Sequence, residues 1–320
     1  MEARMEKERY GMEGVGRREL ISRAAFASSE GMEAAYQSGA ILEGRVTLCD
    51  SSLTLHVDCG CMKGIIKRED AVYSEGGESV KDIAIISRVG KTVCFKVIGF
   101  VKDRYGERRA LLSRRLAQEE CLNERLMRLR AGDVIEARIT HLEHFGAFCD
   151  IGCGIVSMIP IDCISVSRIS HPSDRFTVGD RIRAVVAGHT DDGKGRKVCL
   201  SHKELLGTWE ENAACFESGQ TVSGIVRSVE PYGIFVELSP NLAGLADLRP
   251  RVRIGDVAAV YIKSILPERM KIKLVIVDTY PNEGKRLKPV YYVPESVTHL
   301  EQWVYSPPSC PRYSGRCFGK

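Results

Sequence analysis

A pair of aromatic residues spaced three apart, with a glycine after the first, occurs twice in the chain. The two copies are Phe145-Gly146-Ala147-Phe148 and Tyr232-Gly233-Ile234-Phe235. Each follows a run in which apolar and polar residues alternate as in a β-strand. Flat rings on an exposed sheet face, with lysine and arginine nearby, can hold unstacked bases. The two copies therefore indicate a binding surface for single-stranded nucleic acid.

The alternative is that these rings belong to a hydrophobic core. Regular strand alternation places residues three apart on opposite faces of a sheet. A glycine between them can bend the strand, as at a bulge, and bring both rings to the same face.

The ring pairs lie inside a unit that recurs along the chain at a spacing of roughly 90 residues, which is typical of a domain array. Strands are predicted in the middle copy over 134–141, 146–150, 154–159, 181–188 and 197–201, and in the first copy over 42–48, 53–57, 62–66, 92–99 and 109–113. A shorter version follows Gly219. Five short strands with a longer excursion after the third are typical of an OB-type barrel. The predicted fold class is therefore all-β, with tandem five-stranded OB-fold barrels joined by short α-helices.

Short helices are predicted at the joints between these units. Residues 116–129 and 202–216 carry apolar side chains at helical spacing, and a further helix, interrupted at Gly31, is predicted around 17–37. The last 40 or so residues are irregular in pattern, but Trp303 and Tyr305 indicate that part of this tail docks on the rest of the chain.

Composition limits the class of protein. The chain has 320 residues, of which 44% are hydrophobic and 28% charged, so it is expected to fold. The net charge is only +4, so a nucleic-acid surface must come from local clustering of basic side chains. No apolar run approaches the roughly 20 residues that span a bilayer, and no secretory signal is recognised. A cytoplasmic protein without membrane contact is expected.

Catalytic and metal-binding patterns are not recognised in the sequence. It contains no nucleophile elbow, phosphate loop or metalloprotease signature. The 12 cysteines lie mostly alone in strand-like runs, and neither Cys59/Cys61 nor Cys149/Cys153 has the spacing of a structural zinc site. We therefore expect no catalytic residue, no metal and no cofactor, and a protein that is not an enzyme.

The middle unit resembles the S-one RNA-binding domain, the OB-fold module of the bacterial small-subunit ribosomal protein S-one family. The resemblance covers 132–205. It includes Phe-Gly-Ala-Phe, His171-Pro172-Ser173-Asp174, Val178-Gly179-Asp180 and Leu200-Ser201. The third unit is similar through the stretches 230–238 and 240–245, and the first unit is similar only in layout.

The resemblance implies an RNA site on the outer face of the barrels, built from two aromatics, an acidic residue and a basic residue. The residues implied are Phe145, Phe148, Asp192, Arg196 and Lys197 in the middle unit, Tyr232, Phe235 and Lys271 in the third, and Arg109 in the first.

The sequence also departs from the family pattern. A histidine that the family has at the end of the third strand is replaced by Lys67, Pro160 and Asp247 in the three units. In the first unit, Ser52 and Leu55 are expected at the two aromatic positions. The first unit is therefore predicted to be degenerate.

The predicted organisation has seven segments. They are an N-terminal helical arm (1–38), a degenerate OB-fold repeat (39–115), a linker helix (116–130), an S-one RNA-binding repeat (131–204), a second linker helix (205–218), a shortened S-one repeat (219–277) and an irregular tail rich in proline and tyrosine (278–320).

A dense basic cluster at the end of the first unit allows two interpretations. It consists of Arg108, Arg109, Arg114 and Arg115, and is continued by Arg125, Arg128 and Arg130. These side chains could follow a nucleic-acid backbone. Alternatively, they form a solvated helix face paired with Glu119, Glu120 and Glu124.

The expected function is non-catalytic binding of single-stranded RNA, above all mRNA, in translation or RNA turnover, with the ribosome or RNA-processing proteins as further partners. Two alternatives stay open. The chain could be a scaffold whose barrels hold a ribosomal or nuclease protein, or an accessory region of an enzyme.

Overall fold

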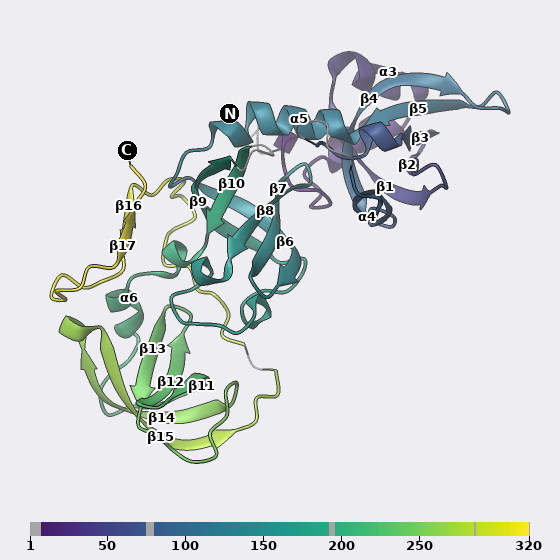
Figure 1. Ribbon diagram of the computed structural model, residues 1–320. Helices are drawn as coiled ribbons and strands as arrows, with labels where there is room; N and C mark the ends of the chain where they lie inside the picture. The colour runs from purple at the N-terminus through teal and green to yellow at the C-terminus, as the bar shows by residue number, and fades with distance from the viewer. Residues whose placement is uncertain (1–7, 75–79, 192–195, 285, 320) are drawn as a thin grey trace. The chain divides into compact units, whose positions relative to one another are not determined.

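The computed structural model describes residues 8–74, 80–191, 196–284 and 286–319. Its strands form three closed five-stranded barrels, labelled β1–β5, β6–β10 and β11–β15 in Figure 1. The predicted all-β class of tandem barrels is confirmed. The chain divides into two compact units. One contains Met1–Leu129, Asp150–Ser157 and Thr190–Val198, and the other contains Arg130–Cys149, Met158–His189 and Cys199–Lys320.

The first barrel has the strand order β1-β2-β3-β5-β4 and is closed by antiparallel pairing of β1 with β4. Its strands are β1 (Ile41–Cys49), β2 (Leu55–Cys59), β3 (Met62–Ile66), β4 (Thr92–Lys102) and β5 (Arg108–Ser113). Alternate residues point inward, so that Leu42, Val57, Phe95 and Leu112 are buried in one core.

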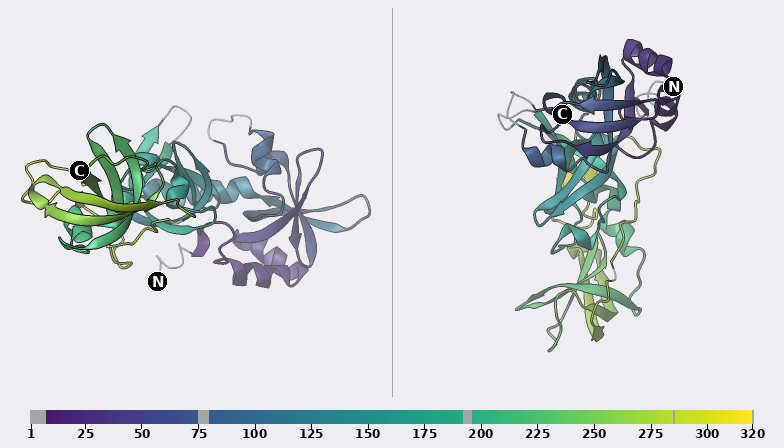
Figure 2. Two further views of the ribbon diagram at one scale, coloured as in Figure 1. Left: turned by 90° about the horizontal axis from the view of Figure 1, so that it is seen from below. Right: turned by 90° about the vertical axis from the view of Figure 1, so that its right-hand side faces the viewer.

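Helices surround this first barrel. They are α2 (Glu19–Phe26), α3 (Ser29–Ser38), η1 (Arg68–Asp70), α4 (Asp82–Ile86), α5 (Arg114–Glu124) and η3 (Leu126–Arg128). The N-terminal pair packs on the barrel, α2 against β1 and α3 against β4 (Figure 2). The interrupted helix predicted around 17–37 is two helices, and the break lies at residues 27–28, before Gly31. They separate because the Ser28 side chain accepts a hydrogen bond from Gly31 N and caps α3.

The middle barrel has the strand order β10-β8-β7-β6-β9. Its strands are β6 (Val134–Glu143), β7 (Gly146–Gly152), β8 (Ile155–Pro160), β9 (Arg181–Asp191) and β10 (Arg196–Ser201). The excursion between β8 and β9 contains η4 (Ile161–Cys163) and η5 (Pro172–Asp174). His171 caps η5, because its Nδ1 accepts a hydrogen bond from Ser173 N at 3.1 Å.

The third barrel has the strand order β11-β12-β13-β15-β14. The joint before it contains η6 (Lys203–Leu206) and α6 (Trp209–Ala213). Its strands are β11 (Thr221–Glu230), β12 (Gly233–Ser239), β13 (Leu242–Ala246), β14 (Val257–Leu266) and β15 (Lys271–Tyr280), with η7 (Pro267–Arg269) between the last two. Strand β15 alternates regularly. Ile272 and Leu274 are buried, whereas Lys271 and Lys273 are exposed.

The C-terminal tail docks on the second unit, as Trp303 and Tyr305 predicted. It forms a two-stranded sheet of β16 (Gln302–Val304) and β17 (Gly315–Cys317). Trp303 and Tyr305 are buried in the core cluster of the third barrel. The Tyr305 hydroxyl donates to Asn241 O at 2.6 Å.

Candidate nucleic-acid interface

The ring pair of the middle barrel lies on the outer surface. Phe145 precedes β7 and is 57% exposed, and Phe148 on β7 is half-buried. Their centroids are 5.9 Å apart and their planes meet at 88°, which is an edge-to-face contact. Ala147 and Cys149, on the opposite side of the strand, supply the buried positions. The interpretation of these rings as core is therefore wrong.

The third barrel repeats this arrangement. Tyr232 is 69% exposed and Phe235 is half-buried. Their centroids are 6.2 Å apart, with an interplanar angle of 86°. Ile234 and Val236 point into the core. Two barrels thus present the same pair of rings in the same edge-to-face geometry.

The glycine between the rings is required by the neighbouring strand. A Cβ atom on Gly146 would lie 2.5 Å from Ile159 O of β8, and one on Gly233 would lie 2.6 Å from Ala246 O of β13. Gly233 also has a φ of +148°, a conformation that favours glycine. Any larger residue would push the second and third strands apart beneath the rings.

A basic residue occupies the same position on the fifth strand of every barrel. The fifth strand pairs in parallel with the third at Ile65–Leu111, Met158–Cys199 and Leu245–Lys273. Two residues before the fifth-strand member of each pair lies a basic residue, namely Arg109, Lys197 and Lys271 in the three barrels. The three predicted basic residues are therefore equivalent in register. Lys197 and Lys271 are exposed, and Arg109 is half-buried.

Lys273 is a basic residue that the sequence analysis did not include. On the outer face of the third barrel, Phe235 is paired with Leu245, and Leu245 is paired with Lys273. One row of side chains thus connects a ring to an exposed ammonium group. The alternation of β15 in the sequence was the signal that could have placed Lys273 on the same face as Lys271.

Two of the predicted residues cannot be placed. Asp192 lies outside the described residues, and so does the side chain of Arg196, although its backbone opens β10. In the first barrel, the corresponding acid Asp103 holds its own turn. Its carboxylate accepts from Tyr105 N at 2.8 Å and forms an ion pair with Arg109 at 2.7 Å.

The prediction of Ser52 and Leu55 at the ring positions of the first barrel is wrong. Leu55 is fully buried in the core. After a register shift in β1, Leu48 pairs with His56, just as Ser228 pairs with Phe235 after the corresponding shift in β11. His56 therefore occupies the position of the second ring. The predicted ring positions therefore lie one residue too early in the first barrel, because the loop before β2 differs from the loop before β12.

A pocket of about 460 Å³ lies on this face of the first barrel, lined by Thr47, Leu48, His56, Val57, Asp58, Lys63 and Arg109. Its basic groups have acidic neighbours within the barrel. His56 Nε2 lies 3.2 Å from the Asp50 carboxylate, and Arg109 is paired with Asp103. Among the described residues on this face, the first barrel thus has His56 at one ring position and basic groups with acidic partners, in contrast to the ring pairs of the other two barrels.

The dense basic cluster is largely paired within the protein, but it matches the second interpretation only in part. Glu119 and Glu124 are partners as expected, whereas Glu120 pairs with Arg9 and Lys96. Arg114 is fully buried, and its guanidinium donates to Glu13 through Nε at 2.8 Å and Nη2 at 3.1 Å. Ion pairs also join Arg108 to Glu33, Arg115 to Asp70 and Glu119, and Arg128 to Glu124. These arginines hold the first unit together.

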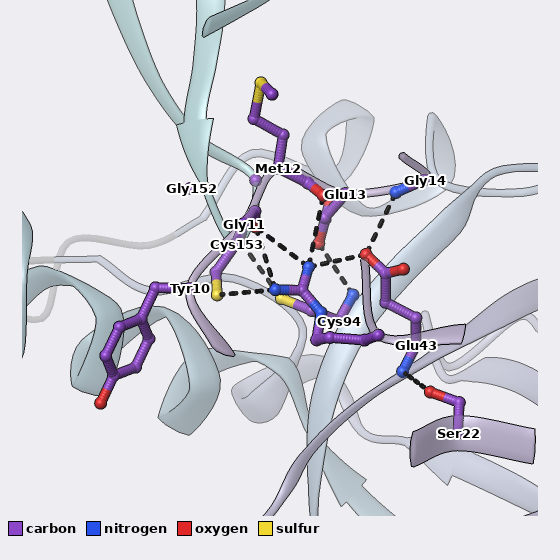
Figure 3. A network of polar contacts seen from close by, with 12 residues as sticks. Tyr10, Gly11, Met12, Glu13, Gly14, Ser22, Glu43, Cys94, Gly152 and Cys153 are labelled. Atoms are coloured by element: carbon purple, nitrogen blue, oxygen red, sulfur yellow. Dashed lines mark hydrogen bonds and ion pairs between the residues drawn. The ribbon is translucent and has the colours of Figure 1, made fainter. Parts of the chain in front are cut away.

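Glu13 belongs to a buried polar network, part of which is drawn in Figure 3. Its carboxylate accepts from Cys94 N at 3.0 Å. Its own N–H donates to the Asp150 carboxylate at 2.8 Å. Close by, the buried Arg18 donates to Glu43 at 2.6 Å and to the carbonyls of Arg9, Gly11 and Met12. The N-terminal segment is thus fixed by buried charge.

All 12 cysteines are free thiols. Among the described residues, no group of three or more His, Cys, Asp or Glu side chains is arranged to hold a metal ion. In the same part of the chain, no helix is both long and apolar enough to cross a membrane.

Residues 128–202 match the family described as S1 RNA binding domain, which is the S-one domain that the middle unit resembles. The chain is 31% identical over 182 residues to small ribosomal subunit protein bS1 of Leuconostoc lactis, a match that covers 56% of this chain and 40% of that protein. It is 26% identical over 277 residues to the bS1 protein of Pseudomonas aeruginosa, with coverages of 82% and 48%. The resemblance to the S-one family is thereby confirmed.

A further relative has a different name. The 4-hydroxy-3-methylbut-2-enyl diphosphate reductase of Fusobacterium nucleatum is 34% identical over 178 residues, a match that covers 53% of this chain and 20% of that protein. The chain spans less than half of the length of each of these three relatives.

Proposed function

We propose that the chain is a non-catalytic protein that holds single-stranded RNA on the ring faces of its middle and third barrels. The observation that carries this proposal is the exposed edge-to-face ring pair, which recurs in two barrels with a glycine between the rings. Both barrels also have a lysine at the same register position of the fifth strand. The residues assigned are Phe145, Phe148, Lys197, Tyr232, Phe235 and Lys271. The similarity to ribosomal proteins supports mRNA as the ligand and translation in the cytoplasm as the setting.

The binding energy follows from stacking and tethering. Each base stacked on a ring contributes on the order of 1–3 kcal/mol, largely without regard to base identity. Two rings and a few phosphate contacts give weak binding by one barrel, and the second barrel adds an effective concentration. We therefore expect RNA composition to matter more than strict sequence.

The double variant Phe145→Ala/Phe148→Ala should weaken binding of a single-stranded oligoribonucleotide by at least tenfold, because it removes two stacking surfaces. Fluorescence anisotropy with a labelled oligomer measures this change. A matched control is Tyr105→Ala/Tyr313→Ala, which removes two rings that are 75% and 67% exposed elsewhere. The control should bind like the wild type. Unchanged affinity of the Phe145/Phe148 variant, with an unchanged melting temperature, would refute the assignment.

Single-stranded RNA should bind more tightly than duplex RNA of the same length, because the bases of an A-form helix are not accessible to rings. A competition assay between an unstructured oligomer and a hairpin stem gives the ratio directly. Equal affinity for the two would contradict stacking as the mode of binding.

A second candidate function concerns the first barrel. Its face has His56 in place of a ring, and the guanidinium of Arg109 is paired with Asp103. These features favour a role in holding a protein partner, such as a ribosomal or nuclease protein. Binding of an oligonucleotide that falls with salt and is lost on competition with heparin favours the RNA function instead.

The similarity to a reductase covers one fifth of that enzyme. The barrels, joints and docked tail account for most of this chain. Both points support a non-catalytic role for the part of the protein given by this sequence.

A further inference from the structure

A second pair of rings adjoins Phe145 and Phe148. His144 immediately precedes Phe145 and is exposed, and its ring lies 4.9 Å from the half-buried ring of His171, at an interplanar angle of 76°. His141 completes the group, with its ring 6.1 Å from that of Phe148. Of the seven histidines of the chain, one thus contacts the ring pair and two more form a ring contact that begins at the residue before Phe145.

The ring of His171 is fixed by the loop that it caps. Its Nδ1 accepts from Ser173 N at 3.1 Å and lies 2.8 Å from the Ser173 hydroxyl. The Asp174 carboxylate accepts in return from His171 N at 3.4 Å. Since Nδ1 is occupied as an acceptor, the ring is held in one orientation. It braces the exposed imidazole of His144.

His141 and His144 differ in their neighbours. The Nε2–H of His141 donates to the Glu143 carboxylate at 2.6 Å, so a positive charge on His141 would be neutralised within the protein. The ring of His144 contacts another imidazole instead. Of the two exposed imidazoles, His144 is therefore the better placed to meet a ligand.

We infer that His144 is a further RNA-binding residue of the middle barrel, with His171 as its positioning residue. This inference rests on the proposed function. An imidazole is a flat surface that can extend the stacking platform beyond Phe145. The ligand is thus a single strand that continues past the two phenylalanines.

The third barrel provides an internal comparison. Its stretch Glu230-Pro231-Tyr232-Gly233 matches Glu143-His144-Phe145-Gly146, so Pro231 stands where the middle barrel has His144. Proline offers no aromatic face. We therefore expect the third barrel to lack the additional stacking surface that His144 gives the middle barrel.

The charged groups around these imidazoles have partners within the protein. Glu143 faces His141, and Asp174 lies beside His171, where Arg227 pairs with its carboxylate at 3.2 Å. The contact of His144 is the ring of His171.

The test uses the full chain and a labelled uridine oligomer. His144→Ala should bind about fivefold more weakly than wild type, since a stack is lost. His144→Phe keeps a flat ring at this position and should bind like wild type.

Two further variants serve as comparisons. His171→Ala should weaken binding by less than His144→Ala, because the ring of His144 stays but is no longer braced. Pro231→Ala, the matched control in the third barrel, should bind like wild type. Wild-type affinity in His144→Ala, with an unchanged melting temperature, would overturn the role of His144 and leave the proposed function intact. Absence of RNA binding by the wild type would instead overturn the proposed function itself, and this inference with it.

Discussion

Glu13→Gln should lower the free energy of opening of the first barrel by about 3–5 kcal/mol, because it leaves a buried guanidinium without its counter-charge. Arg114 and Glu13 are both buried and joined by two hydrogen bonds. Burial alone would raise the pKa of Glu13, but the Arg114 guanidinium outweighs burial and lowers this pKa. Glu13 is therefore ionised, and glutamine would replace a charge by an amide of nearly the same shape.

Amide hydrogen exchange over β1–β5, followed by mass spectrometry, measures this loss locally in a chain with several barrels. The matched control is Glu33→Gln. Its partner Arg108 lies 2.5 Å away and both side chains are more than 40% exposed, so a loss below about 1 kcal/mol is expected. The double variant Glu13→Gln/Arg114→Met should recover part of the loss, since it removes both charges. Equal protection in Glu13→Gln and wild type would show that the pair contributes little.

Acidification from pH 7 to pH 4 should remove about 3 kcal/mol of the stability of the second unit through His202 alone. This imidazole is fully buried. Burial and the charge of Arg175 lower its pKa to about 4, although the hydrogen bond to the Ile164 carbonyl acts in the opposite direction. The unfolded chain takes up the proton near pH 6.5. The stabilisation is therefore complete above that pH and is lost as the pH falls toward 4.

The neutral state of His202 is built into its contacts. Its Nδ1–H donates to Ile164 O at 2.9 Å, and its Nε2 lies 3.2 Å from the hydroxyl of Tyr291, which also accepts from Arg183 N at 3.1 Å. This chain of bonds attaches the tail to the middle barrel. A second proton on the imidazole would displace the Tyr291 hydroxyl as a donor.

The measurement is denaturation of wild type and His202→Asn at several pH values. Asparagine can still donate to Ile164 O but does not titrate, so the stability difference between the two proteins should shrink by about 3 kcal/mol from pH 7 to pH 4. His141→Asn, a change at an exposed histidine, should retain the wild-type dependence. A stability difference that stays constant with pH would mean that His202 does not titrate on unfolding.

The strands and the ring pairs could be predicted from the sequence, because both depend on local pattern. Alternation over five to eleven residues places side chains inside or outside a barrel whatever the rest of the chain does. The motif around Gly146 and Gly233 is local as well. The missing Cβ allows the next strand to approach, and the rings on either side then face outward.

The positions in the first barrel that correspond to the rings were predicted wrongly for a physical reason. Leu55 and His56 are adjacent, and a shift of one residue exchanges the core face for the outer face. That register is set by the bulge between Val46 and Leu48 in the partner strand. It depends on pairing between strands, which a single sequence does not display.

The role of the basic cluster was decided only by the tertiary structure. The run around Arg114 has the same composition whether it faces solvent, RNA or protein. Its partner Glu13 lies 101 positions away in the sequence, and their bond forms only when the N-terminal segment folds across the barrel. The sequence thus determined which side chains could stack on bases, since stacking requires only exposed rings on a strand. The fold determined which charges remain available for a phosphate, since a buried charge must find a protein counter-charge.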